Sequence, residues 1–259
     1  MVTAALVFAV LLSYPLAVFA EVAVETDRPD VATSTSTVPA GYVQFEGGYR
    51  YTRQRIGGTE SSKRSAAEST VRVGLTPAFE LRLDGDAYVD LGGADPANGV
   101  GDILLAAKWR LRDSSEVSAT PSVAVLPFVK LPTADAPIGS ERPDFGLLGL
   151  FGFPLPAALS LDVNLGIAAV GQADPGGFLV QGLAAVSMGR KLLDVVTVFA
   201  EVFGATRAER GGRASVGADA GVIWLVSRRV ALDAAAETSL AGRGPDFGLR
   251  VGLTVLVGP

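Results

Sequence analysis

The chain has 259 residues, is 49% hydrophobic with a mean hydropathy of +0.37, and carries a net charge of −5. It contains no histidine and no cysteine, which excludes disulfides, thiolate metal sites and every mechanism that needs a histidine base. It also has no basic stripe of the kind that nucleic acids require, so we expect no nucleic-acid partner.

Residues 1–20 are the first recognisable element. They carry no charged side chain, and the apolar stretch Ala4–Leu12 is followed by Pro15, with Val18 and Ala20 at positions −3 and −1 of a cleavage site. This pattern predicts a secretory signal peptide, although the usual basic residues before the apolar stretch are missing. The alternatives are a buried N-terminal strand or an anchor helix.

Residues 21–41 are expected to be irregular, because Pro29 and the run Thr33–Thr37 favour neither a helix nor a strand. Composition leaves two placements open for this segment, one in the periplasm as a tail and one inside a barrel as a plug. Residues 42–259 form the remaining unit.

A two-residue period begins at Tyr42 and recurs to the C-terminus. Alternate side chains of a strand point to opposite faces, and between 42 and 52 one face reads Val43, Phe45, Gly47, Tyr49, Tyr51. In the segment 79–91 one predicted face carries Leu81, Leu83, Val89 and Leu91, and the other carries Glu80, Arg82, Asp84, Asp86, Tyr88 and Asp90.

Twelve such segments are predicted, and one face of each carries no Asp, Glu, Lys or Arg. Their ranges are 42–52, 65–75, 79–91, 101–111, 117–130, 144–154, 159–170, 178–189, 195–206, 213–225, 230–241 and 246–257. Tilted membrane-spanning strands need about 9–11 residues, whereas strands of soluble sandwiches average about five or six. The sequence therefore predicts an all-β, antiparallel, up-and-down transmembrane β-barrel in the bacterial outer membrane, and a soluble sandwich is the alternative.

The connections alternate in length. Those at 76–78, 112–116, 155–158, 190–194 and 226–229 are short, and those at 53–64, 92–100, 131–143, 171–177, 207–212 and 242–245 are mostly longer. Bacterial barrels have short periplasmic turns and longer external loops, so both ends of the barrel domain are expected in the periplasm.

Several short motifs resemble the MetA-pathway of phenol degradation family. They are Glu25–Asp30, Val38–Gly41, Gln44–Tyr49, Arg72–Thr76, Glu80–Leu83, Gly101–Asp102, Val129–Thr133 and Pro245–Phe247. The resemblance implies an outer-membrane barrel and the uptake of hydrophobic or aromatic compounds, and it implies no catalytic residue. One departure is the C-terminus, which ends in Pro259 and not in the aromatic residue that the barrel assembly machinery commonly reads.

The charged residues of the predicted inner face are candidate lumen-lining residues. They are Glu46, Arg50, Arg72, Glu80, Arg82, Asp84, Asp102, Lys108, Arg110, Asp162, Glu201, Asp219, Asp233, Glu237 and Arg250. Their excess of acids predicts a polar pore that favours cations or neutral solutes. The alternative is a filled interior in which acids and bases pair across strands.

The connection 131–143 is a candidate constriction loop, because its three prolines limit backbone freedom. Asp135, Glu141 and Arg142 would then supply polar contacts, and an ordinary surface loop is the alternative. No phosphate-binding loop or metal-ligand spacing appears, so we expect no cofactor and no enzyme. The predicted function is passive passage of small molecules, with lipid, the assembly machinery and a solute as partners. A non-conducting structural or adhesive barrel is the alternative.

Overall fold

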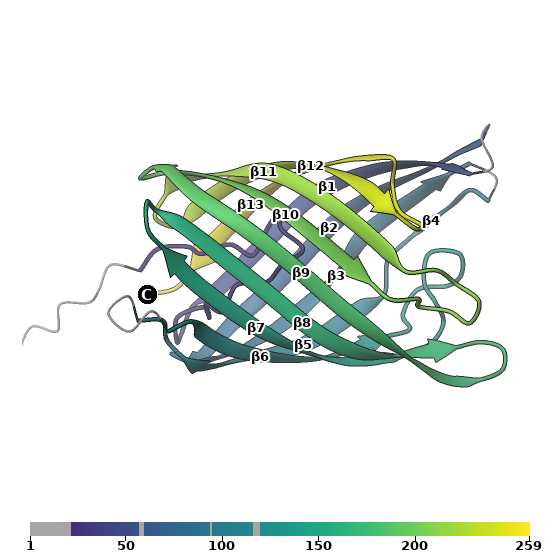
Figure 1. The fold of residues 1–259 in the computed structure, drawn as a ribbon, viewed down its shortest axis with the longest axis horizontal. Coiled ribbons are helices and arrows are strands. Elements are labelled where there is room, and N and C mark those ends of the chain that lie inside the picture. Colours follow the sequence, from purple (N-terminus) through teal and green to yellow (C-terminus); the bar gives the residue numbers. More distant parts are fainter. Residues whose placement is uncertain (1–21, 57–59, 94, 116–119) are drawn as a thin grey trace, which may run out of the picture.

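The computed structural model describes residues 22–56, 60–93, 95–115 and 120–259, so the predicted signal peptide at 1–20 lies outside the described residues. The described residues form one 13-stranded antiparallel sheet (Figure 1). β4 (Ala97–Gly99) pairs with β3 alone, and the other twelve strands close into a barrel through the pairing of β2 with β3. The described residues include no helix long and apolar enough to span a membrane.

The twelve long strands agree with the predicted segments in number and order. They are β1 (Val43–Ile56), β2 (Glu60–Thr76), β3 (Phe79–Gly92), β5 (Ile103–Arg112), β6 (Ser122–Leu131), β7 (Asp144–Leu155), β8 (Leu159–Gln172), β9 (Gly177–Leu193), β10 (Val196–Ala205), β11 (Ser215–Ser227), β12 (Val230–Ala241) and β13 (Phe247–Val257). Closure gives each of the twelve long strands a partner on both sides, which lipid requires because it cannot solvate an unpaired ladder.

The outer surface of the barrel is apolar, as the alternation predicts. Large hydrophobic side chains stand exposed along the strands, among them Phe45, Leu105, Trp109, Ile167 and Val251. The inward neighbours of these residues include Glu46 and Lys108, which are 3% and 0% exposed. This outer face is the one that lipid would cover.

A β-bulge at Ala87 corrects the predicted faces of β3. Ala67 pairs with Tyr88 while Glu68 pairs with Asp86, so Ala87 is an extra residue that exchanges the two faces. Val89 is consequently buried, whereas Tyr88 is 50% exposed. The prediction that Tyr88 and Asp90 point inward is therefore wrong beyond the bulge.

Two predicted connections also differ from the structure. Arg53 pairs with Lys63 and Ile56 with Glu60, so the predicted loop 53–64 is largely a strand hairpin. Residues 53–55 and 62–64 are all polar, which removes the hydrophobic alternation while the backbone pairing continues. At the other end of the barrel, the predicted start of a strand at 117 lies outside the described residues. There β6 begins at Ser122, directly after Pro121, which has no N–H for the ladder.

The N-terminal segment, residues 22–42, runs inside the barrel and is drawn in purple in Figure 1. Its backbone contacts walls on opposite sides, since the Val38 amide donates to Glu80 on β3 and the Ala32 amide donates to Glu201 on β10. The segment enters at the end that also holds Pro259 and the connections 77–78, 156–158, 194–195 and 228–229, which we call the turn end. The opposite end, with the connection 132–143, is the loop end.

Candidate functional site

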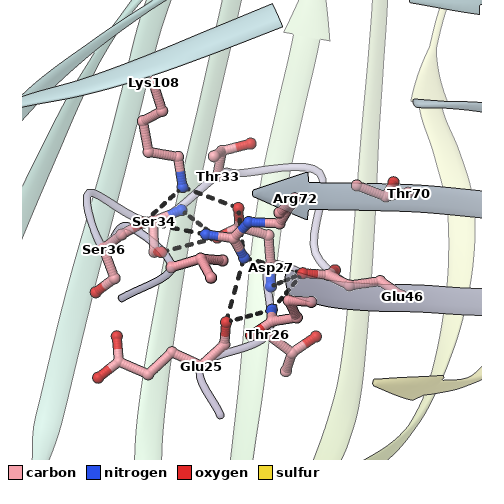
Figure 2. A network of polar contacts seen from close by, with 12 residues as sticks. Glu25, Thr26, Asp27, Thr33, Ser34, Ser36, Glu46, Thr70, Arg72 and Lys108 are labelled. Carbon is pink, nitrogen blue, oxygen red and sulfur yellow. Dashed lines mark hydrogen bonds and ion pairs between the residues drawn. The ribbon is translucent and has the colours of Figure 1, made fainter. Parts of the chain in front are cut away.

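The N-terminal segment is held in the lumen by a buried ion cluster around Asp27 (Figure 2). The Asp27 carboxylate lies 2.6 Å from Arg82, 2.9 Å from Lys108 and 3.2 Å from Arg72. These cations come from β3, β5 and β2, and the hydroxyl of Ser34 donates to the other Asp27 oxygen. One short stretch of the segment is thereby tied to three neighbouring strands.

Two further acids complete the cluster. Arg72 donates to Glu46 at 2.9 Å and to Glu80 at 3.0 Å, and Arg72 is itself only 1% exposed. The carbonyl oxygen of Ser36 accepts from both Arg72 and Lys108. Because each buried charge has several partners, removal of one partner would leave a costly uncompensated charge.

The balance of these contacts sets the ionisation of Asp27. Burial opposes the charged form, but the positive charges of Arg72, Lys108 and Arg82 outweigh it and hold the pKa of Asp27 well below its usual value. Asp27 is therefore ionised at neutral pH.

Arg28 makes a second anchor on the adjoining wall. Its guanidinium lies 2.7 Å from Glu68 and 3.5 Å from Asp233. Gly48 and Gly252 are paired across β1 and β13, and a Cβ on either glycine would overlap the Arg28 side chain. The wall is thus hollowed where Arg28 crosses it, which shows that barrel and segment fit each other.

The bend at Val31–Thr33 is bound by the opposite wall. Both oxygens of Glu201 accept backbone amides, from Val31 at 2.7 Å and from Ala32 at 2.6 Å. The Asn164 side chain accepts from the Thr33 amide at 2.7 Å and donates to the Thr33 carbonyl at 2.9 Å. These contacts replace the hydrogen bonds that an irregular backbone would otherwise make with water.

The lumen has two chemically different walls. The charged wall comprises the inward faces of β1, β2, β3, β5, β12 and β13, which carry the clusters around Asp27 and Arg28. The apolar wall comprises inward side chains of β6, β7, β9 and β10, namely Leu126, Phe128, Leu148, Leu150, Leu183 and Phe203. Such an interior combines an ion-paired half with a half that favours apolar solutes.

Cavities lie on both sides of the segment. At the loop end, spaces of ≈ 580 Å³ and ≈ 560 Å³ are lined by mostly polar residues and share Lys130. At the turn end, a space of ≈ 370 Å³ lies beside Val22, Ser36 and Pro77. The segment therefore separates open spaces at the two ends of the barrel.

The predicted lumen residues fall into distinct places. Glu46, Arg72, Glu80, Arg82 and Lys108 surround Asp27, and Asp84 adjoins them through Arg82. Arg50 and Arg250 both bind Glu237, and Asp233 binds Arg28.

The remaining predicted lumen residues lie on the opposite wall or at the barrel ends. Glu201 and Asp219 face each other in register on β10 and β11, and Asp162 lines a smaller cavity. Asp102 and Arg110 lie at the loop end and the turn end, where they contact the connections.

The three candidate constriction residues, Asp135, Glu141 and Arg142, are exposed. Their loop is bound to Asp102, whose carboxylate accepts the amides of Ala134 and Ser140. Among the three, Arg142 lines the loop-end cavity of ≈ 560 Å³. A constricting role for this loop stays a prediction.

Sequence reasoning missed the residues through which the segment itself acts. Asp27 and Arg28 belong to the motif Glu25–Asp30, which carried the family resemblance but received no role. A signal for the apolar wall was also present, because Leu126 and Phe128 share a strand face with Lys130. The described residues contain no group of three or more acidic side chains arranged to hold a metal ion.

Comparisons with known proteins agree with this architecture. A family model described as "Putative MetA-pathway of phenol degradation" matches residues 26–257. The COG4313 outer membrane channel from Pseudomonas putida F1 is 14% identical, with a TM-score of 0.73 over 90% of this chain and 100% of that chain. No curated protein sequence matches the chain.

Two further solved barrels are similar in fold. The NanC porin is 8% identical, with a TM-score of 0.56 over 82% of this chain and 98% of that chain. The beta domain of the Bordetella autotransporter BrkA is 15% identical, with a TM-score of 0.54 over 83% of this chain and 99% of that chain. The shared feature is a closed barrel of the bacterial outer membrane, and at these identities the likeness shows the fold alone.

Proposed function

Because this chain belongs to the family described as "Putative MetA-pathway of phenol degradation", we propose that it is a passive outer-membrane channel for small, uncharged, hydrophobic or aromatic molecules. The apolar wall supports this class of solute, since Leu148, Leu183 and Phe203 offer contacts that an ion cannot use. The family-like motif Glu25–Asp30 includes Asp27, and the ion pairs of Asp27 with Arg72, Arg82 and Lys108 in the lumen support a role for this motif.

One observation carries the proposal: the N-terminal segment lies in the lumen, is bound by ion pairs and hydrogen bonds, and separates cavities at the two ends. These interactions are non-covalent and can break and re-form, so the segment acts as a plug that must shift before a solute crosses. The walls stay in place because the strand ladder is continuous around the barrel.

A sealed, non-conducting barrel is the second candidate, and the charged wall favours it. Arg72, Glu80 and Lys108 are each 1% exposed or less, and they fill that half of the interior. A structural or adhesive barrel would keep the segment docked permanently.

Planar-bilayer recordings of the complete chain separate the two candidates. The channel predicts measurable single-channel openings for the wild type and a larger, steadier conductance after deletion of residues 22–40. A sealed barrel predicts no openings for the wild type. A Glu25→Gln variant is the matched control, because the exposed Glu25 side chain forms none of the ion pairs that hold the segment. Heat-dependent gel migration would verify that every variant is folded.

A further inference from the structure

An apolar cavity of ≈ 220 Å³ lies inside the barrel against the bend of the N-terminal segment. Five strands, β7 to β11, and the segment contribute to it. Its lining residues are Val31, Leu148, Asn164, Leu183, Ala184, Ala185, Phe203, Gly204, Ala205 and Ser215. Among these lining residues, only Asn164 and Ser215 have polar side chains.

The few polar groups of this cavity are largely occupied already. The Asn164 amide uses its oxygen for the Thr33 amide and its nitrogen for the Thr33 carbonyl. A charged solute would therefore lose its hydration without gaining partners, which is costly in an apolar site. An apolar solute would gain contact with Leu148, Leu183 and Phe203.

Neighbouring glycines keep the centre of the cavity open. The Phe203 ring lies over Gly217 on β11, and Leu148 lies over Gly166 on β8. A Cβ on either glycine would overlap the side chain above it. Both large side chains thus lie against the wall and do not fill the space between wall and segment.

The cavity borders the loop-end space on one side and the bend of the segment on another. Ser215 lines both this cavity and the larger loop-end space of ≈ 560 Å³. Val31 forms part of its floor, and the amides of Val31 and Ala32 are held by Glu201. Beyond the bend lies a small polar space of ≈ 110 Å³ lined by Asp30, Ala32 and Ser34, among others.

We infer that this cavity binds one uncharged, apolar molecule about the size of a single six-membered carbon ring, on the loop-end side of the bend. An apolar protein cavity of roughly 150 Å³ lined by Leu, Ile and Phe holds benzene, and this one is somewhat larger. The inference rests on the proposed function in one respect, because it names the place where a solute waits until the plug shifts.

The direct test is a crystal of the complete chain soaked with bromobenzene, whose bromine gives an anomalous signal. The expected result is a peak enclosed by Leu148, Leu183 and Phe203. Peaks confined to the lipid-facing surface, or no peak at all, would overturn the inference.

Binding in a membrane is tested by ¹⁹F NMR with fluorobenzene and the chain in lipid nanodiscs. Ala185→Leu places a larger side chain in the cavity. We expect the affinity for fluorobenzene to fall by about tenfold or more, which is roughly the effect of altering an apolar pocket. Ala200→Leu is the matched control, because Ala200 is exposed on the outer face of β10; its affinity should equal that of the wild type.

A second variant covers the case in which Ala185→Leu fails to fold. Leu183→Asn keeps the branching at Cγ and the number of side-chain heavy atoms but replaces two methyl groups by an amide, and about tenfold weaker binding is expected. Wild-type affinity in both cavity variants would refute the site. Conductance recorded in parallel separates the two proposals: permeation without binding overturns the cavity alone, and binding without permeation supports the cavity while overturning the channel.

Discussion

Asp27 is the residue on which docking of the N-terminal segment depends most. Three cations from three strands converge on its carboxylate, and no other side chain of the described segment binds as many cations. Backbone groups on either side add contacts to the same wall, since the Glu25 and Ser36 carbonyls both accept from Arg72. These cations also pair with acids of the barrel wall, since Arg72 forms ion pairs with both Glu80 and Asp27. The barrel wall itself is held by strand pairing, so a loss at Asp27 affects the segment first.

Asp27→Asn should therefore release the segment and leave the barrel folded. Breaking a buried ion pair costs about 3–5 kcal/mol, so hydrogen exchange of the Val31, Ala32 and Val38 amides should accelerate strongly. Glu25→Gln, two residues away and exposed, should leave exchange unchanged. Equal protection of these amides in Asp27→Asn and wild type would contradict the assigned role.

Asp30 should make docking of the segment pH-dependent, because its pKa is raised, whereas the pKa of Asp27 is lowered. Burial raises the pKa of Asp30 from 3.8 to about 8; the negative charges of Glu201, Asp219 and Asp162 add to this effect, and a hydrogen bond from Ser187 opposes it. Because the folded pKa lies above the unfolded value, protonated Asp30 favours docking. That contribution is complete below pH 3.8 and is lost as the pH rises through about 8.

Segment release should thus increase between pH 5 and pH 9, after correction for the intrinsic exchange rate. Asp30→Asn should weaken this dependence, because an amide does not titrate in that range. Asp27 should not contribute, since its pKa lies well below that range. A wild-type profile that is flat, or one that is unchanged in Asp30→Asn, would remove Asp30 from the account.

At the scale of elements, strand pairing and outward faces follow from alternation in sequence. Val251 illustrates this, since it is 52% exposed while Arg250 beside it is 8% exposed. A local pattern could not foresee the bulge at Ala87, because the extra residue is defined only by the pairing of β3 with β2. The placement of residues 22–42 was equally out of reach, because an irregular segment has no period and its partners lie far along the chain.

The lipid face can be tested by introducing a charge. Val251→Arg should lower the free energy of unfolding by about 2–4 kcal/mol if the side chain lies near the membrane midplane. Val195→Arg is the matched control, because Val195 is exposed in the turn between β9 and β10, where the cost should be within about 1 kcal/mol. Urea titration of both variants in lipid vesicles gives the two values; equal losses would argue against a lipid-covered wall.

On the scale of the whole molecule, the barrel and its N-terminal segment form two parts with different stabilities. The wall is a closed ladder of twelve long strands, whereas the segment is held by side-chain contacts to both walls. Local regions with few backbone ladders open more readily than the fold around them. Sequence periodicity predicted the first part well, whereas the sequence left both a periplasmic tail and a plug open for the second.

The most direct measurement locks the segment in place. The chain has no cysteine, and the hydroxyls of Thr35 and Ser122 lie 2.7 Å apart, so a Thr35→Cys/Ser122→Cys variant should form a disulfide between the segment and β6. We predict lower permeation for the oxidised channel in planar bilayers and recovery after reduction, with each single-cysteine variant insensitive to reductant. Complete cross-linking with unchanged permeation would contradict a plug that must move, and failure to cross-link in a folded barrel would contradict its position in the lumen.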